Sequence, residues 1–268
     1  MLLRWIPIVC AVLLASGCGS SSEDGAARQT ATPAPTVGSS DLERMPPAPE
    51  PSRLAAASGN AFLRSVFDDA EALWEREFEA AGLDYRPARL TIFSDVVHTA
   101  CGTQESYIGP FYCPASAGVY LDTTFFAALS ARVGVALGDF AQAYVVAHEV
   151  AHHVQSLLGI LGQVAAANEQ HPEGENARSV RVELQADCFA GVWAHSAYRR
   201  GDLTREDFAD ALRAAFVVGS DFQQRAATGT IAPDDWTHGS SAQRQHWLTT
   251  GFEQGRPAAC DTFSIRQP

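Results

Sequence analysis

The chain has 268 residues and a formal net charge of −12, with 19 basic residues, all of them arginine, against 31 acidic ones. An acidic chain without a basic stripe is poorly suited to the phosphate backbone, so charge and composition argue against a nucleic-acid-binding protein. After the N-terminal segments described next, about 210 residues remain, which is ample for one hydrophobic core and short for two domains.

The first segment, residues 1–17, is typical of a signal peptide of the lipoprotein type. Arg4 precedes an apolar run that ends at Ala15 and is too short to span a bilayer comfortably. The residues up to Cys18 resemble a bacterial lipobox, which would make Cys18 the lipidated first residue of the mature protein. Ala15 and Gly17 also suit ordinary signal cleavage at the same bond. Export is therefore expected either way, and a lipid on Cys18 would anchor the protein on the extracytoplasmic side of a membrane.

Residues 18–58 follow as a predicted flexible tether, because they are rich in Ser, Ala, Pro and Thr and contain few large apolar residues. Residues 59–268 are the predicted folded domain. A helical apolar pattern runs from Ala61 to Ala81, Arg89–Phe93 is typical of a strand, and Val119–Leu121 is a second strand-like run. Later helices are predicted to start at Thr204, with a capping box, and at Ser240.

The most informative motif is H-E-x-x-H at His148–His152, inside a helical apolar pattern with Asp139 as the expected N-cap and Gly159 as the stop. Two histidines four residues apart lie on one helix face, so both imidazoles can reach a single Zn²⁺. Glu149 points toward the same side, close enough to take a proton from metal-bound water. A core helix that happens to carry two histidines is the plainer alternative.

A second helical pattern, Val182–Ala194, carries Glu183 and Asp187 four residues apart. An otherwise apolar helix does not bury two carboxylates on one face without partners. Catalytic zinc sites use three protein ligands, so we expect Glu183 to be the third ligand and Asp187 to accept a hydrogen bond from the outer nitrogen of a ligand histidine. The alternative is that both carboxylates lie on a solvated helix face.

Four cysteines remain besides Cys18 and the one in the signal peptide: Cys101, Cys113, Cys188 and Cys260. An even number in an exported domain favours disulfides, and three pairings are possible. We favour Cys101–Cys113, which closes a short loop, and Cys188–Cys260, which attaches the C-terminal tail to the Glu183 helix. Cysteine ligation of zinc is weaker, since no C-x-x-C pair is present.

H-E-x-x-H followed by E-x-x-x-D on a later helix resembles the gluzincin group of metallopeptidases. The chain is more closely similar to the bacterial putative neutral zinc metallopeptidase family, over about residues 60–265. It departs from the family pattern at Ala151, where glycine is more common, and one added methyl group leaves the ligands untouched. The runs that carry the resemblance are Thr99–Gly102, Gly109–Pro114, Val119–Asp122, Gly138–Val145, Ala147–Val150, His152–Gln155, Glu183–Gly191, Thr237–Ser241 and Cys260–Phe263.

This resemblance implies an α+β, zincin-like, mostly helical single domain with a small sheet preceding the H-E-x-x-H helix. In such folds an edge strand passes the metal, and Val119–Leu121 is our candidate. The implied reaction has Glu149 as general base on zinc-activated water. It also needs a donor to the oxyanion, for which His238 is the first candidate because it lies in a matching run, and Tyr112 and Tyr120 are weaker ones.

We therefore expect a zinc metallopeptidase, an endopeptidase with one Zn²⁺ per chain, acting on peptides or proteins at the bacterial cell envelope. The competing hypothesis is a non-catalytic zinc-bearing lipoprotein that binds or scaffolds envelope partners. Glu149 between the two histidines argues against it, since a purely structural metal needs no general base. His153 points away from the ligand face and is expected to be a second-shell or surface residue. The remaining histidines have no ligand-spaced partners and are expected to be polar surface or satisfied core residues: His98, His171, His195 and His246.

Overall fold

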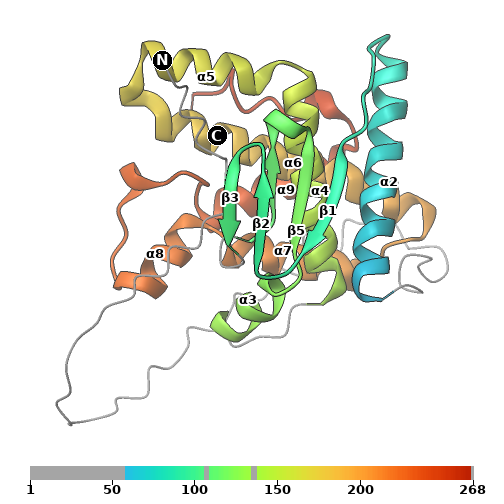
Figure 1. Cartoon of the computed structure of the whole chain (residues 1–268), viewed down its shortest axis with the longest axis horizontal. Helices are drawn as coiled ribbons and strands as arrows, with labels where there is room; N and C mark the ends of the chain where they lie inside the picture. Colours follow the sequence, from blue (N-terminus) through green and yellow to red (C-terminus); the bar gives the residue numbers. More distant parts are fainter. Residues whose placement is uncertain (1–57, 106–108, 134–137, 267–268) are drawn as a thin grey trace.

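The computed structural model describes residues 58–105, 109–133 and 138–266 (Figure 1). The predicted signal peptide, Cys18 and nearly all of the predicted tether lie outside these residues. Within the described part, no helix combines the length and the apolar character that crossing a bilayer requires.

The described chain is mostly helical, with five short strands between the first helix and the others (Figure 1). The strands are β1 (Arg89–Phe93), β2 (Val96–Thr99), β3 (Gly102–Glu105), β4 (Phe111–Cys113) and β5 (Gly118–Asp122). The helices are α2 (Gly59–Ala80), α3 (Phe125–Val133), α4 (Asp139–Leu157), α5 (Ile160–Gln170), α6 (Glu175–Arg200), α7 (Arg205–Val217), α8 (Ser220–Thr228) and α9 (Ser241–Gln254). This confirms the predicted mostly helical α+β domain with a small sheet before the H-E-x-x-H helix.

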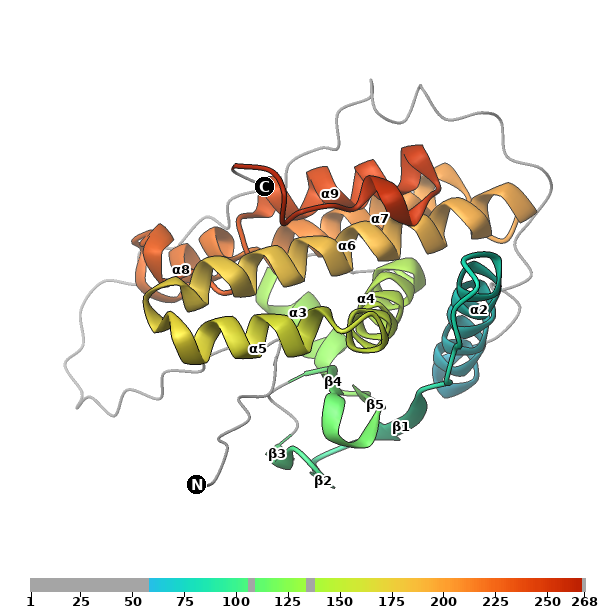
Figure 2. The same cartoon turned by 90° about the horizontal axis from the view of Figure 1, so that it is seen from above.

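The elements are stacked in layers, which Figure 2 shows from above. The strands form one layer, α4 packs between them and α6, and α9 covers the other side of α6. Helix α4, which carries the H-E-x-x-H motif, is therefore enclosed by other elements, and nearly all of its residues from Phe140 to Gln155 are buried. Helix α5 is different, since none of its residues is buried.

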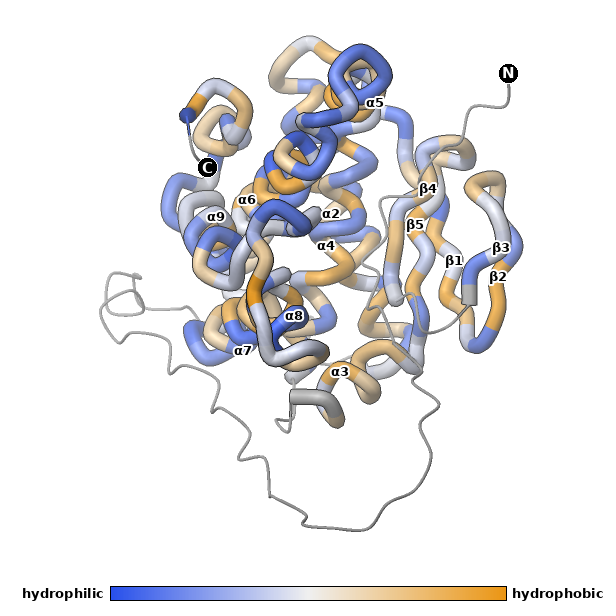
Figure 3. Tube along the Cα trace, turned by 90° about the vertical axis from the view of Figure 1, so that its left-hand side faces the viewer, coloured by the Kyte–Doolittle hydropathy of each residue, from blue (hydrophilic) through white to orange (hydrophobic). Residues whose placement is uncertain are grey.

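Helix α6 and helix α9 approach each other closely because each contributes a glycine to their contact. A Cβ atom on Gly191 would collide with the backbone carbonyl of Leu248, and one on Gly251 would collide with that of Cys188. Hydrophilic and hydrophobic residues alternate along the helices (Figure 3), as helices with one buried face require. In α2, for example, the predicted apolar positions Phe62, Val66 and Trp74 are all buried.

The sheet has the strand order β1-β5-β4, with β1 parallel and β4 antiparallel to β5. The prediction that Val119–Leu121 forms the edge strand is therefore wrong. All five residues of β5 are buried, as is usual for a central strand covered on both faces. Among the described residues β4 pairs only with β5, and it packs against α4, so β4 is the edge strand beside the H-E-x-x-H helix.

Several local predictions are confirmed. Both disulfides, Cys101–Cys113 and Cys188–Cys260, are formed. The capping box at Thr204 and the N-cap at Ser240 are present, and Ser240 also forms a capping box that the sequence analysis did not predict. One boundary is off by a residue: Gly138, not Asp139, is the N-cap of α4, and Asp139 lies in the first turn, where the helix dipole favours an acidic side chain.

Candidate metal centre

Helix α4 holds His148 and His152 one turn apart, with both side chains buried and their ring centroids 4.7 Å from each other. Helix α6 crosses α4 so that Glu183 faces both rings. Oε2 of Glu183 lies 3.1 Å from Nε2 of His148, and Oε1 lies 3.5 Å from Nε2 of His152. One donor atom from each of the three residues falls within 4.8 Å of the others. The three predicted ligands therefore form a group that could hold a metal ion.

The outer nitrogens of the two imidazoles also have partners. Nδ1 of His148 is 2.9 Å from Oδ1 of Asp187, the carboxylate that we expected at this position. Nδ1 of His152 is 2.8 Å from Oε1 of Gln155, which sequence reasoning did not single out. Because both Nδ1 atoms are engaged from behind, both Nε2 atoms face the centre of the group, as ligand histidines require.

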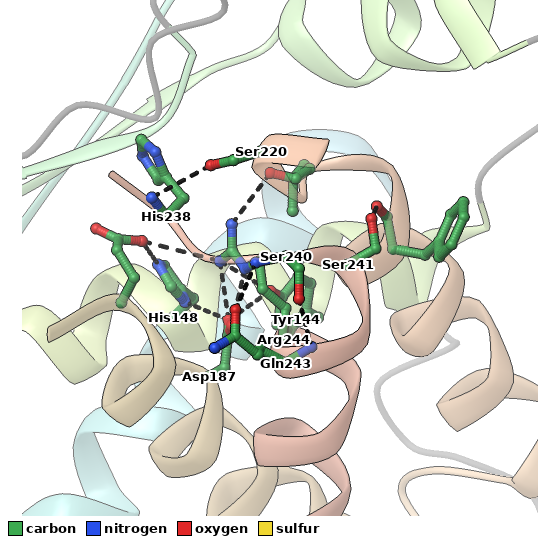
Figure 4. A network of polar contacts seen from close by, with 12 residues as sticks. Tyr144, His148, Asp187, Ser220, His238, Ser240, Ser241, Gln243 and Arg244 are labelled. Atoms are coloured by element: carbon green, nitrogen blue, oxygen red, sulfur yellow. Dashed lines mark hydrogen bonds and ion pairs between the residues drawn. The ribbon is translucent and has the colours of Figure 1, made fainter. Parts of the chain in front are cut away.

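Asp187 belongs to a buried polar network that Figure 4 shows with Tyr144 and Arg244. Arg244 of α9 contacts both carboxylate oxygens of Asp187, through Nε at 2.8 Å and Nη2 at 2.9 Å. The Tyr144 hydroxyl donates to Oδ1 of Asp187 at 2.5 Å and accepts from Nη2 of Arg244 at 3.1 Å. Arg244, together with His148, holds the pKa of Asp187 below its usual value despite burial. The network keeps Asp187 ionised and fixed toward His148.

Arg244 is 1% exposed, and sequence reasoning missed it. A signal was present, since Arg244 lies three, four and seven residues before Trp247, Leu248 and Gly251, which are buried on the same face of α9. An arginine on an apolar helix face is almost never fully buried unless it is paired. It could therefore have been read as the partner of a buried carboxylate.

Glu149 lies in α4, next to His148, and its side chain is buried. Its Oε2 has no hydrogen-bond partner among the described residues. Burial raises the pKa of Glu149 to about 8, while a hydrogen bond from the backbone of Tyr112 opposes the increase. A buried carboxylate oxygen without a hydrogen-bond partner destabilises the folded state, so it is not expected in a helix with a purely structural role. Its position next to the three ligand candidates suits a group that exchanges protons.

The charges around the group fit a cation. Glu183 and Asp187 are both buried, and burial alone would raise the pKa of Glu183, yet the charges of His238 and His152 and the contact with His148 lower it. Burial also lowers the pKa of His148, but Asp187 and Glu183 outweigh this effect and raise it to about 9. Two imidazole nitrogens and one carboxylate are also a donor set that zinc accepts.

His238 lies in the turn between α8 and α9, half-buried, and its charge is close enough to lower the pKa of Glu183. Its backbone N–H donates to Oγ of Ser220 at 3.4 Å (Figure 4), and the backbone N–H of Ser220 donates to the carbonyl of Gly239 at 2.8 Å. The hydroxyl of Thr237 lies 2.8 Å from Nδ1 of His238. The structure thus brings this predicted residue to the rim of the metal group, although it lies 55 residues after Glu183 in the chain.

The other aromatic and histidine candidates serve packing. His153 is 1% exposed and bridges the Tyr112 hydroxyl, 3.0 Å from its Nδ1, and the carbonyl of Arg86, 2.6 Å from its Nε2. Tyr120 stacks on Phe111 with ring centroids 4.9 Å apart. Tyr112 lies in β4. Its hydroxyl contacts His153 and its backbone contacts Glu149, so β4 is attached to α4 at two points.

A mostly helical α+β domain whose H-E-x-x-H helix faces a glutamate on a later helix belongs to the class of zincin-like folds. The chain belongs to the family described as "Putative neutral zinc metallopeptidase", whose model matches residues 37–263. The family implies zinc, and the group formed by His148, His152 and Glu183 is the place in the described structure that could hold it.

Curated relatives include proteins that carry no assigned activity. The "Uncharacterized protein YpfJ" of Escherichia coli strain K12 is 45% identical over 203 residues, which cover 75% of this chain and 70% of that protein. The "Uncharacterized protein Rv2575" of Mycobacterium tuberculosis strain H37Rv is 46% identical over 190 residues, which cover 67% of this chain and 64% of that protein. No solved structure matches the chain.

Proposed function

We propose that this protein is a zinc-dependent peptidase that hydrolyses peptide bonds of proteins or peptides, with endopeptidase activity as the expected form. The observation that carries this proposal is that one donor atom each of His148, His152 and Glu183 lies within 4.8 Å of the others. Next to them in α4 is Glu149, whose Oε2 is buried without a hydrogen-bond partner among the described residues. Three protein ligands are the number that catalytic zinc sites use, whereas structural zinc sites usually use four.

His148, His152 and Glu183 would hold one zinc ion per chain. When bound, zinc supplies a Lewis acid that polarises a substrate carbonyl and makes an attacking water acidic at neutral pH. Oδ1 of Asp187 lies 2.9 Å from Nδ1 of His148, and Asp187 is itself held by Arg244. The ring of His148 is therefore oriented before any substrate arrives.

Glu149 is the proposed general base. Its carboxylate takes a proton from the attacking water and then gives it to the leaving amine. Burial raises the pKa of Glu149 to about 8, which brings it close to neutral pH, the range in which one group can both accept and give back a proton. His238 is the proposed donor to the oxyanion, because a tetrahedral intermediate needs a hydrogen-bond donor and His238 is close enough to lower the pKa of Glu183.

Strand β4 is the proposed platform for the substrate. One edge of β4 pairs with β5, and its backbone at Tyr112 contacts Glu149. An extended peptide that adds to the other edge by backbone hydrogen bonds would pass the general base. This replaces the earlier candidate, Val119–Leu121, which lies in the middle of the sheet.

The proposed location is the bacterial cell envelope, with the lipid on Cys18 as the anchor, and it is supported by the lipobox-like sequence alone. In cells fed a labelled fatty acid, the protein should acquire the label and fractionate with membranes, whereas a Cys18→Ala variant should not be labelled. An unlabelled wild-type protein in the membrane-free fraction would argue against the anchor and leave ordinary export to be tested.

The proposed activity is tested by removing and restoring the metal. The purified protein should contain one zinc per chain and cleave an unstructured protein such as casein. A chelator should abolish the cleavage, and added zinc should restore it. A protein that binds no zinc after reconstitution would contradict the metal centre. One that binds zinc but cleaves nothing in a broad peptide panel would favour the non-catalytic lipoprotein instead.

A further inference from the structure

Gln155 lies one turn after His152 in α4 and is fully buried. Its side-chain amide makes three hydrogen bonds. Oε1 lies 2.8 Å from Nδ1 of His152, while Nε2 donates to the carbonyl of Val182 at 2.8 Å and to Oε1 of Gln185 at 3.0 Å. The two hydrogens of the amide are thus both used, and its oxygen is left for the histidine.

The orientation of this amide follows from its partners. The carbonyl of Val182 can only accept a hydrogen bond, so it must face the NH₂ group of Gln155. The oxygen of Gln155 must then face His152, whose Nδ1 has to be the donor. In a neutral imidazole the proton on Nδ1 leaves Nε2 with the free lone pair. Gln155 therefore selects the tautomer in which His152 presents Nε2 to the metal group.

Gln185 of α6 repeats the same logic one step further from the metal. Its Oε1 accepts from Gln155, and its Nε2 donates to the backbone carbonyl of Cys260 at 3.0 Å. Because that carbonyl also can only accept, it fixes the orientation of the Gln185 amide. Reversing either amide would place two acceptors against each other, at Val182 or at Cys260. A directed chain of hydrogen bonds thus runs from Cys260 to His152.

The C-terminal segment that supplies this carbonyl is itself attached to α6. Cys260 is buried and bonded to Cys188. The hydroxyl of Thr262 donates to the carbonyl of Arg181 at 2.7 Å, and the Arg181 guanidinium donates back to Thr262 and, at 2.9 Å, to the carbonyl of Ile265. The segment Cys260–Ile265 therefore lies against α6 within a turn of Glu183.

The two ligand histidines are thus oriented by different chemistry. His148 is held by a carboxylate paired with Arg244, whereas His152 is held by two neutral amides that end at a backbone carbonyl. An amide cannot take the Nδ1 proton from the ring, so it fixes the tautomer by its dipole alone. Glutamine is not a usual zinc ligand, so the sequence gives no sign that either residue belongs to the metal centre.

We propose that the segment Cys260–Ile265 is a working part of the metal centre, which positions His152 through Gln185 and Gln155. This inference rests on the metal-binding half of the proposed function. It makes Gln155 and Gln185 positioning residues and assigns to the Cys188–Cys260 disulfide the task of holding the terminal acceptor in place. Partners that orient a ligand from outside typically change metal affinity about 10–100-fold when they are removed.

The test measures zinc affinity of the full-length protein by competition with a chromophoric chelator, together with thermal unfolding of each metal-free variant. Gln155→Met removes the acceptor for His152 and both donors, whereas Gln155→Glu removes donors but keeps an acceptor oxygen. We expect Gln155→Met to lower zinc affinity about 10–100-fold and Gln155→Glu to lower it less, although a buried carboxylate destabilises the fold more. Zinc affinity would then be lower in the variant that lacks the acceptor for His152, and not in the variant with the lower melting temperature.

The matched control is Gln142→Met in the same helix, at a half-buried position outside this chain of hydrogen bonds. Gln185→Met tests the link to the C-terminal segment and should also weaken zinc binding, with the Gln155→Met/Gln185→Met pair no worse than Gln155→Met alone. Zinc affinity of Gln155→Met equal to that of the control would overturn the inference. So would a Gln185→Met variant that binds zinc like the wild type, since the segment would then be uncoupled from His152. A wild-type protein without zinc would instead refute the proposed function itself.

Discussion

Replacing Glu149 by glutamine is expected to leave zinc bound and to slow peptide hydrolysis by about 10²–10⁴-fold. The amide keeps the shape of the side chain but cannot accept a proton from the attacking water. The ligand group should survive, because neither His148, His152 nor Glu183 has Glu149 among its hydrogen-bond partners. Zinc content and the rate of casein cleavage are the two measurements, made on the same preparation.

The two readouts separate chemistry from structure in this variant. Zinc retained with activity lost supports Glu149 as the base. Unchanged turnover would remove Glu149 from that role and direct attention to another proton acceptor. The melting temperature of the metal-free variant should not fall. Burial raises the pKa of the Glu149 carboxyl group to about 8, and the substitution puts a neutral amide in place of this group.

The second large effect is expected at the third ligand. Glu183→Ala should abolish stoichiometric zinc retention, because it removes the only carboxylate of the ligand group and leaves two imidazoles. The measurement is zinc per chain after gel filtration against a weak chelator. Glu175→Ala is the matched control, since Glu175 lies at the start of the same helix, outside the ligand group.

Equal zinc content in these two variants would mean that another residue is the third ligand. Asp187 would then be the nearest alternative, but both of its oxygens are already engaged by Arg244. Releasing Asp187 for the metal would leave a buried guanidinium without its main partner, which costs several kcal/mol. This is the physical reason for preferring Glu183.

Much of the candidate site could be predicted from sequence because its residues act through local periodicity. The spacing of His148 and His152 and the spacing of Glu183 and Asp187 each require only a helix. Capping at Thr204 and Ser240 is equally local, and these predictions are confirmed. The cysteine pairs needed one further assumption, export, which makes disulfides the expected use of an even number of cysteines.

What could not be predicted depends on contacts between distant segments. The neighbours of β5 come from residues 89–93 and 111–113, and nothing in Val119–Leu121 itself distinguishes a central strand from an edge strand. Arg244 and Asp187 are 57 residues apart, so the pattern of α9 could indicate that Arg244 pairs with a buried carboxylate but not which carboxylate it is. Gln155 and Gln185 carry no charge and no ligand chemistry, so only the structure reveals that they complete the site.

The three ligand candidates come from α4 and α6. In the chain these two helices are connected through α5, which has no buried residue. A bound ion would therefore act as a noncovalent cross-link that closes the loop between positions 148 and 183. Its binding free energy would add to the free energy of unfolding, by about 2.7 kcal/mol at a free zinc concentration one hundred times the Kd. Metal supply would then govern how long the protein survives degradation as well as whether it is active, and its abundance would rise and fall with the zinc around it.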